Sequence, residues 1–201
     1  MSGPWIKVCG ITTPEAVNAS AAAGVDAIGF VFAESPRRVT PERAYRLAAP
    51  VRGRIACCAV VRRTSQSEVD EILRVLRPDM LQLDAGEIGS LQLPCTLQVL
   101  PVVSTRAPTQ ADPPGRLLLE RPPTDDGAGW DEAGIRVLSR RTHLVLAGGL
   151  DAGNVGRLVR SLGPWGVDVS RGVEVAPGIK GHDLIRRFAQ AARTTHGEVA
   201  I

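Results

Sequence analysis

Aromatic side chains are scarce in this sequence. Three Trp, three Phe and one Tyr make up 3% of the 201 residues, whereas 44% of the residues are hydrophobic. A core with so few rings must be built from Val, Ile, Leu and Ala, which is typical of a sheet covered by helices and argues against an aromatic-rich β-sandwich. The length suits one hydrophobic core. We therefore expect a single domain over residues 1–201.

Long apolar runs are also missing. The segment Leu144–Leu150 is one of the longest of them, whereas a membrane-spanning helix needs about 20 residues. Lys7 and Cys9 interrupt the N-terminal segment before the apolar centre of a signal peptide can form. We expect a cytoplasmic protein with no membrane interaction.

Cysteine and net charge are equally limited. The four cysteines, Cys9, Cys57, Cys58 and Cys95, show no C-x-x-C spacing, which argues against a disulfide framework or a zinc site. The net charge of +3 is too small to indicate a nucleic-acid partner, and no basic stripe alternates with aromatic residues. We expect reduced thiols, no metal site and no binding of nucleic acid.

Lysine is nearly absent. Of the 24 basic residues, only Lys7 and Lys180 are lysines. Their positions either have a specific role or arose by chance, and the sequence leaves both explanations open.

Short β-branched runs alternate with helical patterns along the chain. The predicted strands cover Ile6–Val8, Ala27–Phe32, Ile55–Val60, Met80–Leu83, Thr96–Val99, Arg116–Glu120, His143–Ala147 and Val167–Val169. Helix starts are predicted at Thr13 before Pro14, Thr40 before Pro41, Ser65 with Glu68 as a capping box, Asn154 before Val155, and His182 before Asp183.

The order of these elements predicts the fold. Eight successive β/α units, none with room for more than one helix, indicate an α/β fold of the (β/α)8 TIM barrel type. The alternative is an open doubly wound sheet, but that fold needs fewer strands and usually has a Gly-rich turn after the first one, which Cys9–Thr12 does not provide. Prolines interrupt the stretch Asp84–Gly115, where we expect short or irregular connections.

The active sites of such barrels lie at the C-terminal ends of the strands. The first strand offers Lys7 and Cys9, which share the face opposite Ile6 and Val8 and are predicted to point into the barrel. Because a nearby ammonium group favours the thiolate, Cys9 is a candidate base or nucleophile. The alternative is an inert core cysteine.

Two further strand ends carry charged groups. Arg37 and Arg38 follow the second strand and either clamp a carboxylate in a bidentate fork or are simply solvated. Glu120 ends the sixth strand. It either places a carboxyl group at the mouth of the barrel or has a structural role, as a helix cap or in an ion pair.

The last two strands open into glycine-containing loops. Gly148 and Gly149 follow the seventh strand, and Gly172 follows the eighth. Loops at these two places often bind phosphate through backbone N–H groups, and glycine permits the close approach. None of the three histidines ends a strand, which argues against a Ser/His hydrolase, and no His/carboxylate cluster indicates a metal enzyme. What remains is acid–base chemistry by a thiol and a carboxyl group on a phosphorylated small molecule.

Several motifs occur in order from the first strand to the last helix. They comprise Lys7–Thr12, Gly29–Phe32 with Ser35–Arg37, Leu81–Leu83, Ala147–Leu150 with Asn154–Val155, Val167–Ser170, Gly172–Glu174 and Pro177–Lys180. In these motifs the chain resembles the phosphoribosylanthranilate isomerase family of tryptophan biosynthesis.

The resemblance implies a monomeric or homodimeric barrel that needs no cofactor. The implied reaction converts N-(5-phosphoribosyl)anthranilate into a 1-deoxyribulose 5-phosphate product by an Amadori rearrangement. The implied catalytic residues are Cys9 as base and Glu120 as acid. The implied substrate contacts are Lys7, Asp168 and, to the anthranilate carboxylate, Arg37. The implied phosphate ligands are Gly148, Gly149 and Gly172, and Arg171 in the same loop either grips the phosphate or fills its place.

The site also departs from the family pattern. Glu120 replaces an Asp and is one methylene longer, and Asp84 stands where the family has His. Arg171 replaces a Ser and would have Asp84 as its partner if the two sides of the mouth approach each other. The segment Asp126–Asp131 is shorter than its Gly-rich counterpart. Three explanations follow: a working isomerase that has drifted, a paralogue for a related phosphoribosyl or anthranilate-like substrate, or a non-catalytic binder of a phosphorylated metabolite.

Overall fold

The structure is a computed structural model that describes residues 3–104, 113–121 and 130–194. Its main strands are β1 (Trp5–Cys9), β2 (Ala27–Val31), β3 (Ala56–Val60), β4 (Met80–Asp84), β5 (Gln98–Ser104), β6 (Arg116–Glu120), β7 (His143–Ala147) and β8 (Gly166–Val169). Within the described residues these eight strands form a closed parallel barrel, in which each strand pairs with the next and β8 pairs with β1. The predicted (β/α)8 TIM barrel is confirmed.

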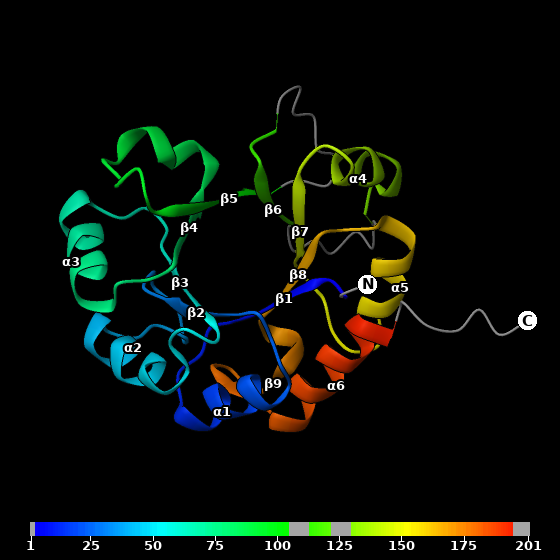
Figure 1. The fold of residues 1–201 in the computed structure, drawn as a ribbon, viewed down its shortest axis with the longest axis horizontal. Helices are drawn as coiled ribbons and strands as arrows, with labels where there is room; N and C mark the ends of the chain where they lie inside the picture. Colours follow the sequence, from blue (N-terminus) through cyan, green and yellow to red (C-terminus); the bar gives the residue numbers. More distant parts are fainter. Residues whose placement is uncertain (1–2, 105–112, 122–129, 195–201) are drawn as a thin grey trace, which may run out of the picture.

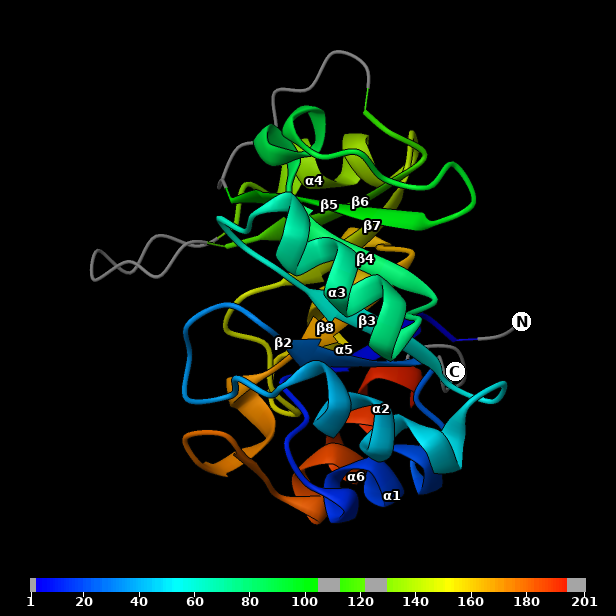
Figure 2. The same cartoon turned by 90° about the vertical axis from the view of Figure 1, so that its left-hand side faces the viewer.

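Helices surround the barrel (Figure 1). They are α1 (Pro14–Ala22), α2 (Pro41–Ala48), α3 (Gln66–Leu76), α4 (Glu132–Ser139), α5 (Val155–Leu162) and α6 (His182–Arg193). Shorter elements are the 3-10 turns η1 (Ala49–Val51), η2 (Ala85–Ser90) and η3 (Arg171–Val173), and a hairpin of β9 (Glu174–Ala176) and β10 (Ile179–Lys180). Seen from the side in Figure 2, α1 and α6 cover one side of the barrel and α4 covers the opposite side.

Local sequence signals begin most of these helices. The side chains of Thr13 and Thr40 accept hydrogen bonds from the first turns of α1 and α2, each of which has a proline in its first turn. Ser65 and Glu68 form the predicted reciprocal capping box of α3. The predicted starts of these three helices are confirmed.

One predicted helix start is displaced by one residue, and one helix is missing from the prediction. Helix α6 begins at His182 itself, with Gly181 in the capping position. The Gly181 N–H donates to the Val173 carbonyl at 2.8 Å, which holds the chain at this point. Helix α4, whose start is capped by the Asp131 side chain, is absent from the predicted elements.

Strand β5 is also misplaced in the prediction. The strand runs from Gln98 to Ser104 rather than over Thr96–Val99, and it passes through Pro101. Pairing of β5 with β6 begins only at Val102, so the missing N–H of Pro101 falls just before that ladder. The proline is therefore compatible with the strand.

The connection after β4 is irregular, as predicted, since η2 is a 3-10 turn and no α-helix occurs between β4 and β5. The next connection includes Pro108, and residues 105–112 lie outside the described residues. Residues 126–129 of the segment predicted to be shortened also lie outside them.

Both faces of the sheet are apolar, as expected for parallel strands. Side chains that point outward, such as Ile6, pack against the helices, whereas Leu100 and Leu118 point inward and fill the barrel. At the N-terminal end, Trp5 stacks on Trp165 with ring centroids 5.2 Å apart, and both pack against the interior cluster. Side chains therefore close this end, and polar groups collect at the other.

Candidate active site

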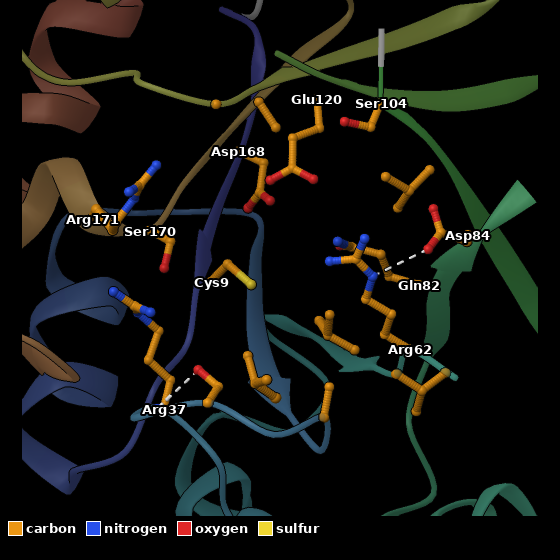
Figure 3. A pocket seen from close by; sticks show the side chains of 18 of the residues that line it. Cys9, Arg37, Arg62, Gln82, Asp84, Ser104, Glu120, Asp168, Ser170 and Arg171 are labelled. Atoms are coloured by element: carbon orange, nitrogen blue, oxygen red, sulfur yellow. Dashed lines mark hydrogen bonds and ion pairs between the residues drawn. The ribbon is translucent and has the colours of Figure 1, made fainter. Parts of the chain in front are cut away.

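A cavity opens at the C-terminal ends of the strands (Figure 3). It is lined by side chains that continue the inward-facing alternation of the strands beyond the apolar interior. Inward-facing residues in its wall include Cys9 from β1, Gln82 and Asp84 from β4, Glu120 from β6 and Asp168 from β8. The alternation of side chains along neighbouring strands thus builds the site.

Lys7 and Asp168 form a buried ion pair at the bottom of this cavity. The Lys7 Nζ lies 3.0 Å from Asp168 Oδ1, and the two side chains are 0% and 8% exposed. Burial alone would lower the pKa of Lys7, but the Asp168 carboxylate and the nearby Cys9 and Cys58 thiols raise it overall. Burial raises the pKa of Asp168, and Lys7 opposes this shift. The predicted inward orientation of Lys7 and Cys9 is confirmed.

Cys9 lies directly above this pair. A Cβ atom on Gly29 of β2 would come within 3.0 Å of the Cys9 sulfur and 3.2 Å of Lys7 Nζ, so glycine makes room for both groups. Burial raises the pKa of the Cys9 thiol, while Lys7 and Lys180 lower it. Lys7 therefore favours the thiolate as predicted, and Lys180 acts in the same direction, but burial has the larger effect and the pKa of Cys9 is raised overall.

Glu120 lies beside Asp168 at the mouth of the cavity (Figure 3). Partial burial and the nearby Asp168 carboxylate raise the pKa of Glu120, with a further contribution from Asp84, while Arg62 and Arg171 oppose the shift. A carboxyl group with a raised pKa keeps its proton to higher pH. It is thus suited to donate a proton.

Arg37 is held by a carboxylate of the protein itself. Its Nε and Nη2 atoms donate to the two oxygens of Glu174 at 2.7 Å each. Lys180 donates to Glu174 Oε1 at 2.9 Å and to the Ser170 carbonyl at 3.0 Å. Burial would raise the pKa of Glu174, but the bonds from Arg37 and Lys180 lower it. Arg38 is exposed and does not line this cavity.

The sequence contains two lysines, and both are buried in ion pairs next to Cys9. Lys7 is 0% exposed and Lys180 is 4% exposed. Both lower the pKa of the Cys9 thiol. A specific role for these lysines is therefore favoured over chance.

The glycine loops form the wall across from β3 and β4. Gly148 and Gly149 have φ angles of +92° and +70°, which favour glycine. A Cβ atom on Gly172 would overlap the Leu150 carbonyl, so this position also requires glycine. Asn154 donates to the Gly149 carbonyl at 2.8 Å rather than capping α5 through its side chain. Arg171 lines the cavity next to these loops.

The sequence profile of the N-(5'-phosphoribosyl)anthranilate (PRA) isomerase family matches residues 6–191. The N-(5'-phosphoribosyl)anthranilate isomerase of Brucella canis is 36% identical over 212 aligned positions, which cover 96% of each chain. The chain belongs to the phosphoribosylanthranilate isomerase family.

Solved structures of this family superpose on the barrel. TrpF from Jonesia denitrificans is 36% identical, with a TM-score of 0.76 over 96% of this chain and 98% of that one. Phosphoribosyl anthranilate isomerase from Thermotoga maritima is 27% identical, with a TM-score of 0.79 over 95% and 99%. A further phosphoribosyl anthranilate isomerase, solved in complex with reduced 1-(o-carboxyphenylamino)-1-deoxyribulose 5-phosphate, is 26% identical with a TM-score of 0.77 over 95% and 99%.

The departures from the family pattern lie around one cavity. Asp84 forms an ion pair with Arg62, whose Nε is 3.3 Å from Asp84 Oδ2. Asp84 therefore has a partner just beyond the end of the adjacent strand β3, and no ion pair joins it to Arg171 among the described residues. Glu120, Asp84 and Arg171 all line the cavity together with Cys9.

Three of the polar residues that line this cavity have no predicted role: Arg62, Gln82 and Ser104. The signal for them is the period of two, because Arg62 continues the inward alternation of Cys58 and Val60, and Gln82 follows Met80 in the same way.

In the part of the chain that the structure describes, no group of three or more His, Cys, Asp or Glu side chains could hold a metal ion. None of the described helices is both long and apolar enough to cross a membrane.

Proposed function

We propose that this protein isomerises N-(5-phosphoribosyl)anthranilate to 1-(2-carboxyphenylamino)-1-deoxyribulose 5-phosphate by general acid–base catalysis, with Cys9 as base and Glu120 as acid. Family membership over residues 6–191 supports the reaction. The observation that carries the assignment of roles is the arrangement of a buried thiol and a carboxyl group with a raised pKa in one cavity, next to glycine loops. No cofactor is needed for the proton transfers of this rearrangement.

Glu120 acts first. The protonated carboxyl group donates its proton to the ribose ring oxygen, the bond between C1 and this oxygen breaks, and the anilino nitrogen supplies the electron pair that forms a Schiff base at C1. Because partial burial and the Asp168 carboxylate raise the pKa of Glu120, a larger fraction of this group is protonated at a given pH than for an ordinary glutamate. The surroundings of Glu120 thus favour the protonated form that the first step needs.

Cys9 acts second. Its thiolate removes the proton from C2 of the Schiff base, and the electron pair moves to form the enolamine, which tautomerises to the ketose product. The positive charges of Lys7 and Lys180 lower the pKa of Cys9 against the effect of burial. The positive charge of the Schiff base would also lower the pKa of Cys9 and so favour the thiolate.

The remaining residues hold the substrate. Backbone N–H groups of Gly148, Gly149 and Gly172 are suited to a phosphate, and Arg171 adds a positive charge beside them. Asp168, held by Lys7, lines the cavity and offers a carboxylate to a ribose hydroxyl. A relative from Thermotoga maritima is described as dimeric, and we expect this protein to be a monomer or a homodimer.

The test is the loss of fluorescence when purified protein is mixed with phosphoribosylanthranilate. We expect turnover with the wild type and none above background with Cys9→Ala. Cys95→Ala is the matched control, because Cys95 is an exposed thiol that does not line the cavity. A wild-type protein that binds phosphorylated ligands but leaves the fluorescence unchanged would refute the proposal and favour a paralogue or a non-catalytic binder.

A further inference from the structure

The β9–β10 hairpin places a buried ion pair beside the cavity. Glu174 begins β9 and Lys180 ends β10, and the two residues are paired across the hairpin. Lys180 Nζ lies 2.9 Å from Glu174 Oε1, and the two side chains are 0% and 7% exposed. A buried ion pair contributes little net stability, which favours a role of this pair in the site over a role in folding.

Glu174 holds Arg37 in one orientation. The Nε and Nη2 atoms of Arg37 donate to the two carboxylate oxygens at 2.7 Å each. A guanidinium group has a second pair of donors at its end, on Nη1 and Nη2. Among the described residues Nη1 has no hydrogen-bond partner, and Arg37 lines the cavity. The bonds to Glu174 therefore leave the end of Arg37 available for the aromatic carboxylate that the family resemblance assigns to this residue.

The stem of Arg37 packs against the loop that follows the base. Gly10, the residue after Cys9, has a φ angle of +79°, and a Cβ atom there would come within 2.5 Å of Arg37 Cδ. The hairpin is attached to the same loop, since Thr12 Oγ1 donates to the Gly178 carbonyl at 2.7 Å. The carboxylate-binding arginine, the hairpin and the loop of the base thus form one packed unit.

Lys180 depends on Glu174 for its only carboxylate partner among the described residues. Its Nζ atom donates to the carbonyl and the hydroxyl of Ser170, at 3.0 and 3.2 Å, and to Glu174. Burial lowers the pKa of Lys180, and Glu174 is the main group that opposes this shift. Loss of the carboxylate would therefore favour the neutral amine.

Five elements contribute charged or titratable groups around the Cys9 thiol. They are Lys7 on β1, Cys58 on β3, Asp168 on β8, Lys180 on β10 and Arg37 after β2. Glu174 is absent from the groups that shift the pKa of the Cys9 thiol, whereas Lys180 lowers this pKa. Any influence of Glu174 on the base thus passes through Lys180.

Resting on the proposed function, we infer that Glu174 is a positioning residue that links recognition of the substrate carboxylate to activation of the base. On one side it presents the end of Arg37 to the carboxylate. On the other side it keeps a charged ammonium group of Lys180 next to Cys9. Glu174 itself contacts neither the substrate nor the reacting atoms.

The experiment compares Glu174→Gln with the matched control Glu42→Gln, which makes the same change at an exposed residue outside this cavity. For Glu174→Gln we expect the KM for phosphoribosylanthranilate to rise about 10-fold or more, as for a weakened charge-assisted hydrogen bond. The acid limb of kcat/KM should move to higher pH by about one unit, because a neutral Lys180 no longer favours the thiolate. Glu42→Gln should resemble the wild type. An unchanged KM, or an acid limb that moves to lower pH, would overturn the inference.

Lys180→Met tests the route of the effect. This variant should move the acid limb in the same direction, but its KM should stay within about threefold of the wild-type value because Glu174 still holds Arg37. In the double variant with Glu174→Gln, the acid limb should lie where it lies in Lys180→Met alone. Additive shifts of the two changes would show that Glu174 does not act through Lys180 and would refute the inference.

Two measurements that need no turnover separate this inference from the proposed function. The ultraviolet absorbance of the thiolate, taken as the difference between each protein and its Cys9→Ser counterpart, gives the pKa of Cys9, and we expect Glu174→Gln to raise it. Calorimetry compares the reduced product 1-(o-carboxyphenylamino)-1-deoxyribulose 5-phosphate with the same compound lacking the carboxyl group, and Glu174→Gln should weaken binding of the carboxylated ligand more. Equal weakening of both ligands would refute the inference. A wild-type protein that shows both expected differences from Glu174→Gln but does not isomerise would refute only the proposed function.

Discussion

Replacing Lys7 by Met removes one partner of the buried ion pair beneath Cys9, and so tests what this pair contributes to stability. Met has an unbranched apolar stem that suits the barrel interior, but it leaves the Asp168 carboxylate, 8% exposed, without the ammonium group 3.0 Å away. Removing one partner of a buried pair costs about 3–5 kcal/mol. Lys180, which also acts on Asp168, remains and favours the lower end of this range. At about 2–4 °C per kcal/mol for a chain of this size, the Tm should fall by about 6–20 °C.

The loss of stability should depend on pH in a defined direction. Burial raises the pKa of Asp168 even with Lys7 present, and removal of Lys7 raises it further. The folded variant therefore binds more protons than the unfolded chain above about pH 4, the ordinary pKa of Asp, and its stability falls as the pH rises through this range. Relative to the wild type, Lys7→Met should be less destabilised at pH 5 than at pH 8.

Urea unfolding at pH 5 and pH 8 measures the loss in the free energy of unfolding and its dependence on pH. The double variant Lys7→Met with Asp168→Asn should recover part of the loss at pH 8, because the unpaired charge is gone. A loss below about 1 kcal/mol at pH 8, or an equal loss at both pH values, would refute the electrostatic account. The acid limb of kcat/KM should also move to higher pH in Lys7→Met, since the ammonium group lowers the pKa of Cys9.

Four further predictions concern the catalytic cavity. Cys9→Ser should retain little turnover in the fluorescence assay because a hydroxyl is hardly ionised near neutral pH, and retention of more than about a tenth of wild-type turnover would contradict thiol catalysis. Glu120→Gln should lower kcat by about 100-fold or more, whereas unchanged kinetics would exclude Glu120 as the acid. Because Asp84 raises the pKa of Glu120, Asp84→Asn should move the alkaline limb of the pH profile to lower pH, and a shift to higher pH would contradict this coupling. Arg171→Ser should weaken the binding of inorganic phosphate, measured by calorimetry, by about 1.5–3 kcal/mol, and tighter binding would show that Arg171 blocks the phosphate loops.

Local patterns in the sequence were sufficient to predict the barrel. The period of two in β1 separates Lys7 and Cys9 from Ile6 and Val8 because successive side chains of any strand point to opposite faces. The cap at Ser65 was predictable for a similar reason, since its bonds are made within one turn of chain. These features depend on residues that are close in the sequence.

Partners that are distant in the sequence were decided only by the tertiary structure. Arg37 and Glu174 are 137 positions apart, and Lys7 and Asp168 are 161 positions apart. The extent of β5 through Pro101 likewise depends on where β6 begins to pair with it. The net direction of the Cys9 pKa shift depends on how completely the barrel excludes water, which no local pattern records. The sequence by itself thus determined which groups face the mouth, and the closure of the barrel decided which of them are paired with one another, as Lys7 is with Asp168 and Arg62 with Asp84.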